Sequence, residues 1–159
     1  KGDTGGWIKE DSARHGGWAS RRVREALEEW PHYLPGTQGD TLRLAGVVGV
    51  GRNPVRCVAG KSAPDGQHGV NLVHRDDVIA AIELLLQAPK GGHIYNICAP
   101  SHPSRNAFYP LMARQLGLAP PVFADAQGAG KGKIIDGNRI CHELGFEYQY
   151  PDPLVMPMD

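Results

Sequence analysis

No excess of positive or negative charge marks this sequence. Its 159 residues include 17 Lys or Arg and 17 Asp or Glu, so the whole chain produces no long-range field that would collect nucleic acid or anionic lipid. Extended apolar stretches are also absent, because the run at residues 78–82 ends at Glu83, whereas a membrane span needs roughly 18 residues. We therefore predict that neither nucleic acid nor a membrane is a partner.

Cysteine is rare, and histidine is not spaced for metal binding. The three cysteines lie far apart in the sequence and form no CxxC pair, which favours buried free thiols and a reducing cytoplasm. The seven histidines include no HExxH motif and no pair four residues apart on a predicted helix. We expect a cytoplasmic protein without a metal site.

The length and the glycine content indicate one loop-rich domain. Residues 1–159 are enough for a single core, since domains hold roughly 100 to 200 residues. The 21 glycines and 13 prolines stay below the level of a low-complexity chain, about 25 to 30%. The chain starts Lys-Gly-Asp-Thr-Gly-Gly, with neither Met nor an apolar signal segment, so we expect it to be the rear part of a longer protein.

Strand patterns and helix patterns alternate along the chain, as in α/β folds. Apolar runs predict buried parallel strands at residues 41–48, 69–74 and 93–98, and shorter strands at 120–123 and 133–135. Helical periodicity predicts helices at 21–30, 75–88, 108–116 and 138–144. We expect two of these helices to bury an apolar stripe, formed by Val23, Leu27 and Trp30 in the first and by Val78, Ile79, Ile82, Leu85 and Leu86 in the second.

A glycine-rich turn follows the first of these strands. The string GVVGVG at residues 46–51 is similar to a dinucleotide-binding loop, in which glycines let the backbone approach a pyrophosphate. The residues after it open no amphipathic helix, so the fingerprint is incomplete. His74 closes another predicted strand, at the end where open α/β sheets place their sites. A histidine packed under a loop is nevertheless the commoner case at such a position, and helix capping explains Asp76 and Asp77.

Four strings, taken in order, carry a family resemblance. They are LRLAGVVG at 42–49, NLVHRDDV at 71–78, IYNI at 94–97 and LGF at 144–146. Together they resemble the C-terminal half of an extended short-chain dehydrogenase/reductase of the NAD(P)-dependent epimerase/dehydratase family. The longer strings APKGGHIYNICAP at 88–100, GKGKIIDG at 130–137 and YQYPDP at 148–153 resemble its bacterial YeeZ-like subgroup.

The resemblance implies a fold and a set of site residues. The fold is the C-terminal part of a Rossmann-like, doubly wound parallel sheet with a small α/β substrate-side lobe, and residues 1–159 form that part. The cofactor is NAD or NADP, held mainly by an N-terminal half outside this chain. By position, Gly46, Val47 and Gly49 become cofactor-binding candidates, and Arg52, His74 and Asp77 become substrate-pocket candidates, for a small molecule of unknown identity.

The catalytic pair of the family is not recognisable. Its members use a Tyr with a Lys four residues later as the proton partner of hydride transfer, and no Tyr of this sequence has Lys at that spacing. The resemblance thus leaves two hypotheses, an oxidoreductase of unknown substrate or a non-catalytic dinucleotide-binding or sensor module. In a third interpretation a partner chain supplies the other half of the sheet, and exposed strand edges then promote homo-oligomers.

Overall fold

The computed structural model describes residues 5–12, 18–33, 35–124 and 132–158, and these form an α/β fold. The elements in chain order are β1 (Gly6–Ile8), α1 (Trp18–Glu29), η1 (Trp30–Tyr33), β2 (Thr41–Leu44), β3 (Gly46–Val48), η2 (Pro54–Cys57), β4 (Ser62–Pro64), β5 (Leu72–His74), α2 (Arg75–Gln87), β6 (Ile94–Ile97), α3 (Arg105–Gln115), β7 (Val122–Ala124), β8 (Lys133–Ile135), α4 (Arg139–Leu144) and η3 (Pro153–Val155). From β5 to β7 strands and helices alternate as the sequence predicts, whereas β2 to β5 follow one another with only η2 among them.

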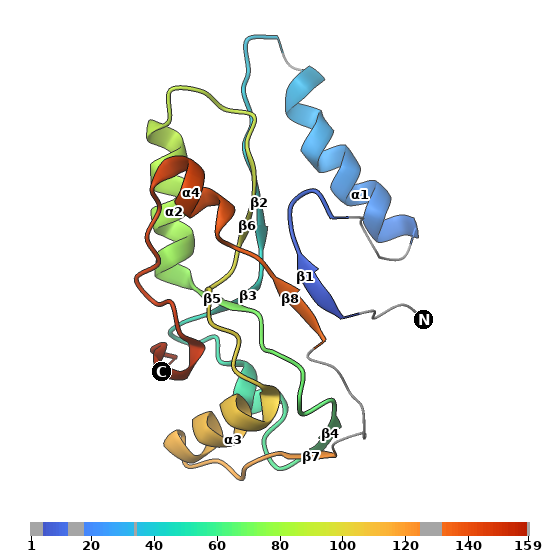
Figure 1. Cartoon of the computed structure of the whole chain (residues 1–159), viewed down its shortest axis with the longest axis vertical. Helices are drawn as coiled ribbons and strands as arrows, with labels where there is room; N and C mark the ends of the chain where they lie inside the picture. The colour runs from blue at the N-terminus through green and yellow to red at the C-terminus, as the bar shows by residue number, and fades with distance from the viewer. Residues whose placement is uncertain (1–4, 13–17, 34, 125–131, 159) are drawn as a thin grey trace.

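Every strand pairing among the described residues is parallel. The pairs are β1 with β8, β2 with β6, β3 with β5, and β4 with β7. The β2–β6 pair sets Leu42 opposite Tyr95 and Leu44 opposite Ile97, which confirms the predicted pair of neighbouring co-directional strands. Figure 1 shows α2 and α4 on one side of this pair and α1 on the other.

The predicted strand at residues 41–48 is two strands, which is a correction to the sequence analysis. The chain changes partner at Ala45, whose N–H donates to Ile97 O of β6 at 3.0 Å. The next N–H, from Gly46, donates to Asn71 O at 3.1 Å, beside β5. Both halves are apolar, so the sequence pattern predicts one continuous strand. The hydrogen bonds instead place β2 and β3 in two different sheets.

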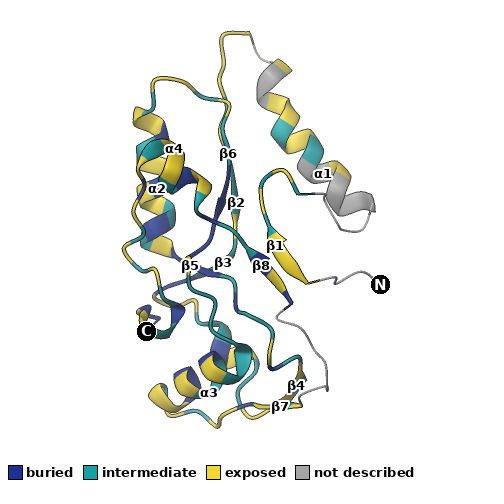
Figure 2. Ribbon diagram, viewed as in Figure 1, coloured by how far each residue is buried: buried dark blue, intermediate teal, exposed yellow. Residues whose placement is uncertain are grey.

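The core divides into two clusters, and the helices contribute buried side chains to them unequally (Figure 2). In α2, Leu85 of the predicted stripe is buried and Val78 is half-buried, whereas the other three residues of the stripe, Ile79, Ile82 and Leu86, are exposed. In and after α1 the predicted face is also wrong, because Leu27 is 65% exposed and Trp30 is 62% exposed. The side chain of Val23 lies outside the described part of the chain.

The cysteines only partly follow the prediction of buried thiols. Cys98 is buried, Cys141 is half-buried and Cys57 is exposed, and all three are free. Burial raises the pKa of the Cys98 thiol to about 12, against a weaker opposing effect of its hydrogen bond to Leu72 O. Cys98 therefore stays a protonated core residue at neutral pH.

The C-terminal segment (residues 146–158) returns from α4 to the core cluster that contains Val48 and Leu72. Met156 and Met158 are buried there against Val48, Leu72 and their neighbours. The segment thereby connects the β2–β6 half of the molecule to the lobe that contains α3 (Figure 1). None of the helices in the described ranges has the length and apolarity that a membrane crossing requires.

Candidate functional site

The amino ends of β3 and β5 and the loop after β6 meet at the carboxyl ends of β2 and β6. After β2 the chain reaches Gly46, which is bonded to Asn71 O. After β6, Ala99 N donates to Leu72 O at 2.8 Å, and Pro103 O accepts from Val70 N at 2.9 Å. Open parallel sheets bind ligands outside the carboxyl ends of their strands. We therefore take this edge, with the adjoining β1–β8 pair, as the candidate functional site.

The glycine turn places its backbone at this edge. A Cβ on Gly46 would lie 2.9 Å from Leu72 Cδ2 and 3.2 Å from Asn71 O, so only glycine permits this close approach. Gly49 and Arg52 exchange backbone hydrogen bonds of 3.3 and 2.9 Å, which closes a tight turn. Gly46 and Arg52 are exposed, Val47 is half-buried and Gly49 is buried. Their cofactor and substrate roles stay predictions.

His74 is buried, and both nitrogens of its ring have partners. Nδ1 accepts a hydrogen bond from Asp76 N at 3.2 Å, so His74 caps the N-terminus of α2. Nε2 lies 3.1 Å from Pro157 O, and because a carbonyl only accepts, Nε2 carries the proton. The ring of Tyr150 packs against it, with centroids 4.2 Å apart. These contacts connect β5 to the C-terminal segment.

Asp77 also binds the C-terminal segment. Its carboxylate accepts from Gln149 N at 2.7 Å and from Tyr150 N at 3.2 Å, and only 1% of the residue is exposed. Burial raises the pKa of this carboxyl, and the two backbone hydrogen bonds oppose the rise. The structure thus brings His74 beside Gly49 and turns Asp77 toward the segment that covers this end of α2.

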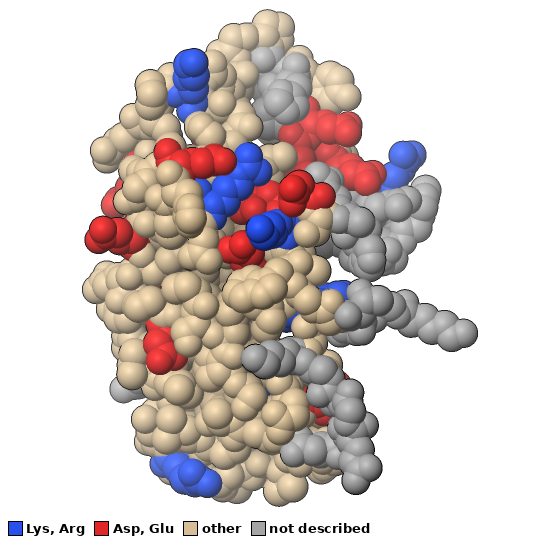
Figure 3. Space-filling view, in the orientation of Figure 1, with Lys and Arg blue, Asp and Glu red and all other residues tan. Residues whose placement is uncertain are grey.

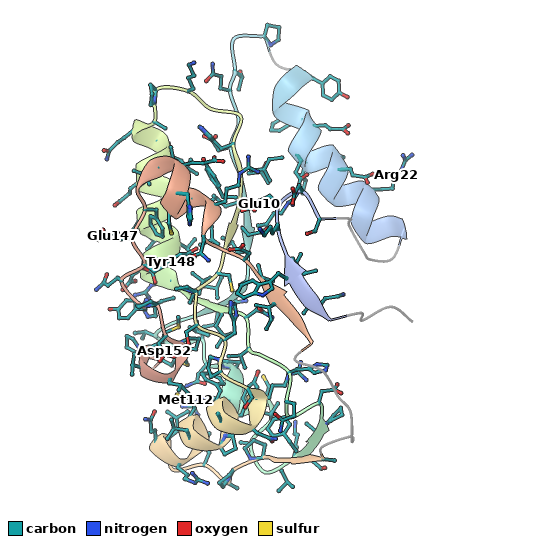
Figure 4. The ribbon with its side chains drawn as sticks, viewed as in Figure 1. Glu10, Arg22, Met112, Glu147, Tyr148 and Asp152 are labelled. Atoms are coloured by element: carbon teal, nitrogen blue, oxygen red, sulfur yellow. The ribbon has the colours of Figure 1, made fainter. Side chains whose placement is uncertain are left out.

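A polar network on the β2–β6 pair was missed by the sequence analysis. Arg43 donates from Nε and Nη2 to the two carboxylate oxygens of Glu28, at 2.9 and 3.2 Å, and from Nη1 to Glu10 O at 2.8 Å. The Glu10 carboxylate accepts from Asn96 N at 2.8 Å. Figure 4 shows Glu10 between α1 and the strands. A charged residue inside an otherwise apolar strand was the available signal.

Two further residues of this edge were also missed, Asn71 and His102. The Asn71 amide donates to Lys133 O at 2.9 Å and accepts from Ile135 N at 2.8 Å, so a side chain takes the place of a neighbouring strand along β8. His102 Nδ1 lies 3.1 Å from Val70 O. The available signals were that Asn71 is a polar residue inside the predicted strand at 69–74 and that His102 follows the predicted strand at 93–98.

Neither charged side chains nor groups of metal-ligating side chains mark a single site. Figure 3 shows Lys and Arg interspersed with Asp and Glu over the upper part of one face, and few charges over the lobe of α3. Within the described ranges no three His, Cys, Asp or Glu side chains are grouped to hold a metal ion.

Solved structures share this fold. A functionally unknown conserved protein from Silicibacter pomeroyi superposes with a TM-score of 0.76 at 24% identity, over 97% of this chain and 59% of that one. MoeE5 in complex with UDP-glucose and NAD gives 0.69 at 20% identity, over 91% and 55%. The human epimerase family protein SDR39U1 with NADPH gives 0.69 at 20% identity, over 96% and 58%. The fold is the Rossmann-like fold of NAD(P)-dependent epimerases and short-chain dehydrogenases/reductases.

The sequence comparisons place the chain more closely. No family model matches it, but it is 68% identical over 158 residues to protein YeeZ of Escherichia coli K12. The match covers 99% of this chain and 58% of YeeZ. The chain is thus similar to YeeZ over nearly all of its own length, as its strings predict, and it spans 58% of the length of that relative.

Proposed function

We propose that this chain forms the carboxyl-terminal, substrate-side part of an NAD(P)-dependent epimerase/dehydratase-like oxidoreductase. The observation that carries the proposal is the convergence of the Gly46–Asn71 contact and the loop after β6 at one carboxyl edge of a parallel sheet. Two proteins whose structures share the fold, MoeE5 and SDR39U1, were solved with NAD and with NADPH respectively. The nicotinamide would lie against this edge, and the exposed backbone of Gly46 would form part of its wall.

The outer edge of β2 supports a division of the site between this chain and a preceding half. The N–H groups of Thr41 and Ala45 face β6, and N–H groups alternate in direction along a strand, so those of Leu42 and Leu44 face away. No strand in the described ranges pairs with that edge, and Leu44 is 46% exposed. We infer that further strands of the full-length protein continue the sheet there and hold the dinucleotide phosphates.

The proton partner of the reaction separates this function from a second candidate. Hydride transfer at a carbonyl needs a positioned acid or base, and no Tyr of this sequence has Lys four residues later. That observation favours, as the second candidate, a dinucleotide-binding or sensor module without turnover. Turnover of any alcohol, aldehyde or sugar nucleotide by the full-length protein would decide for the enzyme.

Binding of reduced cofactor tests the proposal. The full-length protein is titrated with NADH and with NADPH, and binding is followed by the fluorescence of the reduced nicotinamide. We expect saturable binding of at least one of them. The 159-residue chain is the control, and we expect it to bind neither tightly, because it carries no complete phosphate-binding glycine loop. Failure of the full-length protein to bind both would contradict the proposal.

A further inference from the structure

One flank of α2 carries three large apolar side chains that face solvent. Ile79 is 47% exposed, Ile82 is 44% exposed and Leu86 is 81% exposed. Their spacing of three and four residues sets them beside one another on a helix of about 3.6 residues per turn. These three residues form the α2 stripe. Contiguous exposed apolar surface marks an interaction site, whereas scattered apolar residues need no explanation.

The α2 stripe lies on the flank of α2 opposite the C-terminal segment. Around the helix, buried Ala81 is at the centre of the core-facing side, with Asp77 on one flank and Ile82 on the other. Asp77 binds the C-terminal segment, which follows α4, and α4 lies against β6. Figure 1 shows α2 and α4 on the same side of the β2–β6 pair. The stripe therefore faces away from α4, toward the side on which the outer edge of β2 lies.

The outer edge of β2 is open on that same side. No strand in the described ranges pairs with it, and Leu44 of this edge is 46% exposed. A doubly wound sheet carries helices on both of its faces. Strands that continue the sheet past β2 would therefore bring a helix into the layer that contains α2. Neighbouring helices pack with their axes roughly 8 to 10 Å apart, so that helix would cover the stripe.

The rest of the full-length protein has the length to supply such a helix. The match to YeeZ covers 99% of this chain but 58% of YeeZ, and the remainder is far longer than an average helix of about 11 to 12 residues. Ile and Leu side chains form no hydrogen bonds, so an occupant gains affinity there by burying apolar surface of its own. The apolar side of an amphipathic helix has this chemistry and this spacing.

We propose that an amphipathic helix, from the part of the full-length protein that precedes this chain, packs its apolar side on the α2 stripe. The proposal rests on the continued sheet of the proposed function and adds a helix-on-helix contact beside the strand-on-strand contact at β2. It requires no cofactor. Because the two parts then share an apolar layer as well as a sheet, they would unfold as one cooperative unit.

Alkylation of an introduced thiol tests the contact in the full-length protein. Leu86→Cys places the thiol in the stripe, and Gln87→Cys, at the next exposed residue outside the stripe, is the matched control. Labelling by N-ethylmaleimide is followed site by site by mass spectrometry, and each rate is divided by the rate of the same thiol in denaturant. We expect the Leu86→Cys thiol to react about tenfold more slowly than the control, because the contact must open before the reagent enters. Equal relative rates would overturn the proposal.

Dilution separates this occupant from a second copy of the chain. A contact within one molecule protects the thiol to the same degree at every protein concentration, whereas a contact between copies obeys mass action. Protection that disappears on dilution, together with dimers followed by light scattering, would assign the stripe to a second copy and overturn the proposal. Cys98 is buried and should stay unlabelled throughout, which reports that the protein is folded.

Thermal unfolding of the full-length protein gives a second readout. Leu86→Gln should lower the Tm by about 5 °C, because an amide group replaces an apolar side chain in a buried contact. Ala80→Gln, at an exposed residue on the other flank of α2, should change the Tm by less than about 1 °C. An unchanged Tm in Leu86→Gln would overturn the proposal. A protected stripe in a protein that binds neither NADH nor NADPH would support this contact and contradict the proposed function.

Discussion

Replacement of Gly137 by Ala will lower the free energy of unfolding by about 3 kcal/mol, at the upper end of the cost of overpacking. A Cβ at Gly137 would overlap Cys98 O and would lie 2.8 Å from Cys98 N and 2.7 Å from Tyr148 Oη. Two of these atoms are backbone and cannot rotate away. The third, Tyr148 Oη, accepts from Cys98 N at 3.2 Å and donates to Gly137 O at 2.9 Å, so the added methyl group also breaks this bridge.

Thermal unfolding measures the effect, and a nearby glycine is the control. For a domain of this size the loss corresponds to a fall in Tm of about 6 to 12 °C. Gly145 has a φ of 68° but open space around its Cβ direction, so Gly145→Ala should cost only about 1 kcal/mol. Equal effects of the two substitutions would show that the close contact of Cys98 with residue 137 does not limit stability.

Replacement of Asp77 by Ala will also destabilise the chain strongly, by about 2 to 4 kcal/mol. The substitution removes the acceptor of two part-buried hydrogen bonds, from the N–H groups of Gln149 and Tyr150, at about 1 to 2 kcal/mol each. Asp77→Asn is the matched control, because its amide oxygen still accepts from Gln149 N while its NH₂ group faces Tyr150 N. We expect the Asn variant to lose about half as much, measured by denaturant unfolding.

The pKa of Asp77 also predicts how the difference in stability between the unmodified protein and Asp77→Asn depends on pH. Burial raises that pKa above 3.8 in the folded protein, so the folded state holds the proton more tightly than the unfolded state. The contribution of Asp77 to stability is therefore larger below its folded pKa and falls as the pH rises through it. Asn does not titrate, so the gap between the two proteins should widen as the pH is lowered toward 4. A gap that narrows would contradict the assigned direction.

The local sequence was sufficient to predict elements that an apolar run or a helix-start signal marks by itself. The strand at residues 93–98 was predictable because an apolar run follows a helix after a short turn, and β6 (Ile94–Ile97) lies within it. The start of α2 at Arg75 was predictable from adjacent carboxylates in the first turn. The same reasoning located the carboxyl edge, because it needs only strand direction and not side-chain contacts.

Features that depend on distant partners were not predictable. The break at Ala45 arises because the adjacent N–H groups of Ala45 and Gly46 donate to two different parts of the chain. These are the end of β6 and the residue before β5, and both lie far along the sequence. The exposed stripe of α2 has the composition of a core face, and sequence alone does not say which face the strands cover. The contacts of His74 and Asp77 with the C-terminal segment involve separations of 72 to 83 residues.

Amide hydrogen exchange of the full-length protein, with and without saturating NADH or NADPH, tests most directly whether this chain is one side of a dinucleotide site. The Leu42 and Leu44 amides should exchange slowly in both states, because in our proposal strands outside this chain pair with that edge of β2. Residues 45–49 should become slower only when cofactor is bound. Fast exchange at Leu42 and Leu44, or unchanged exchange at 45–49 with cofactor present, would contradict both the continued sheet and the site at its carboxyl edge.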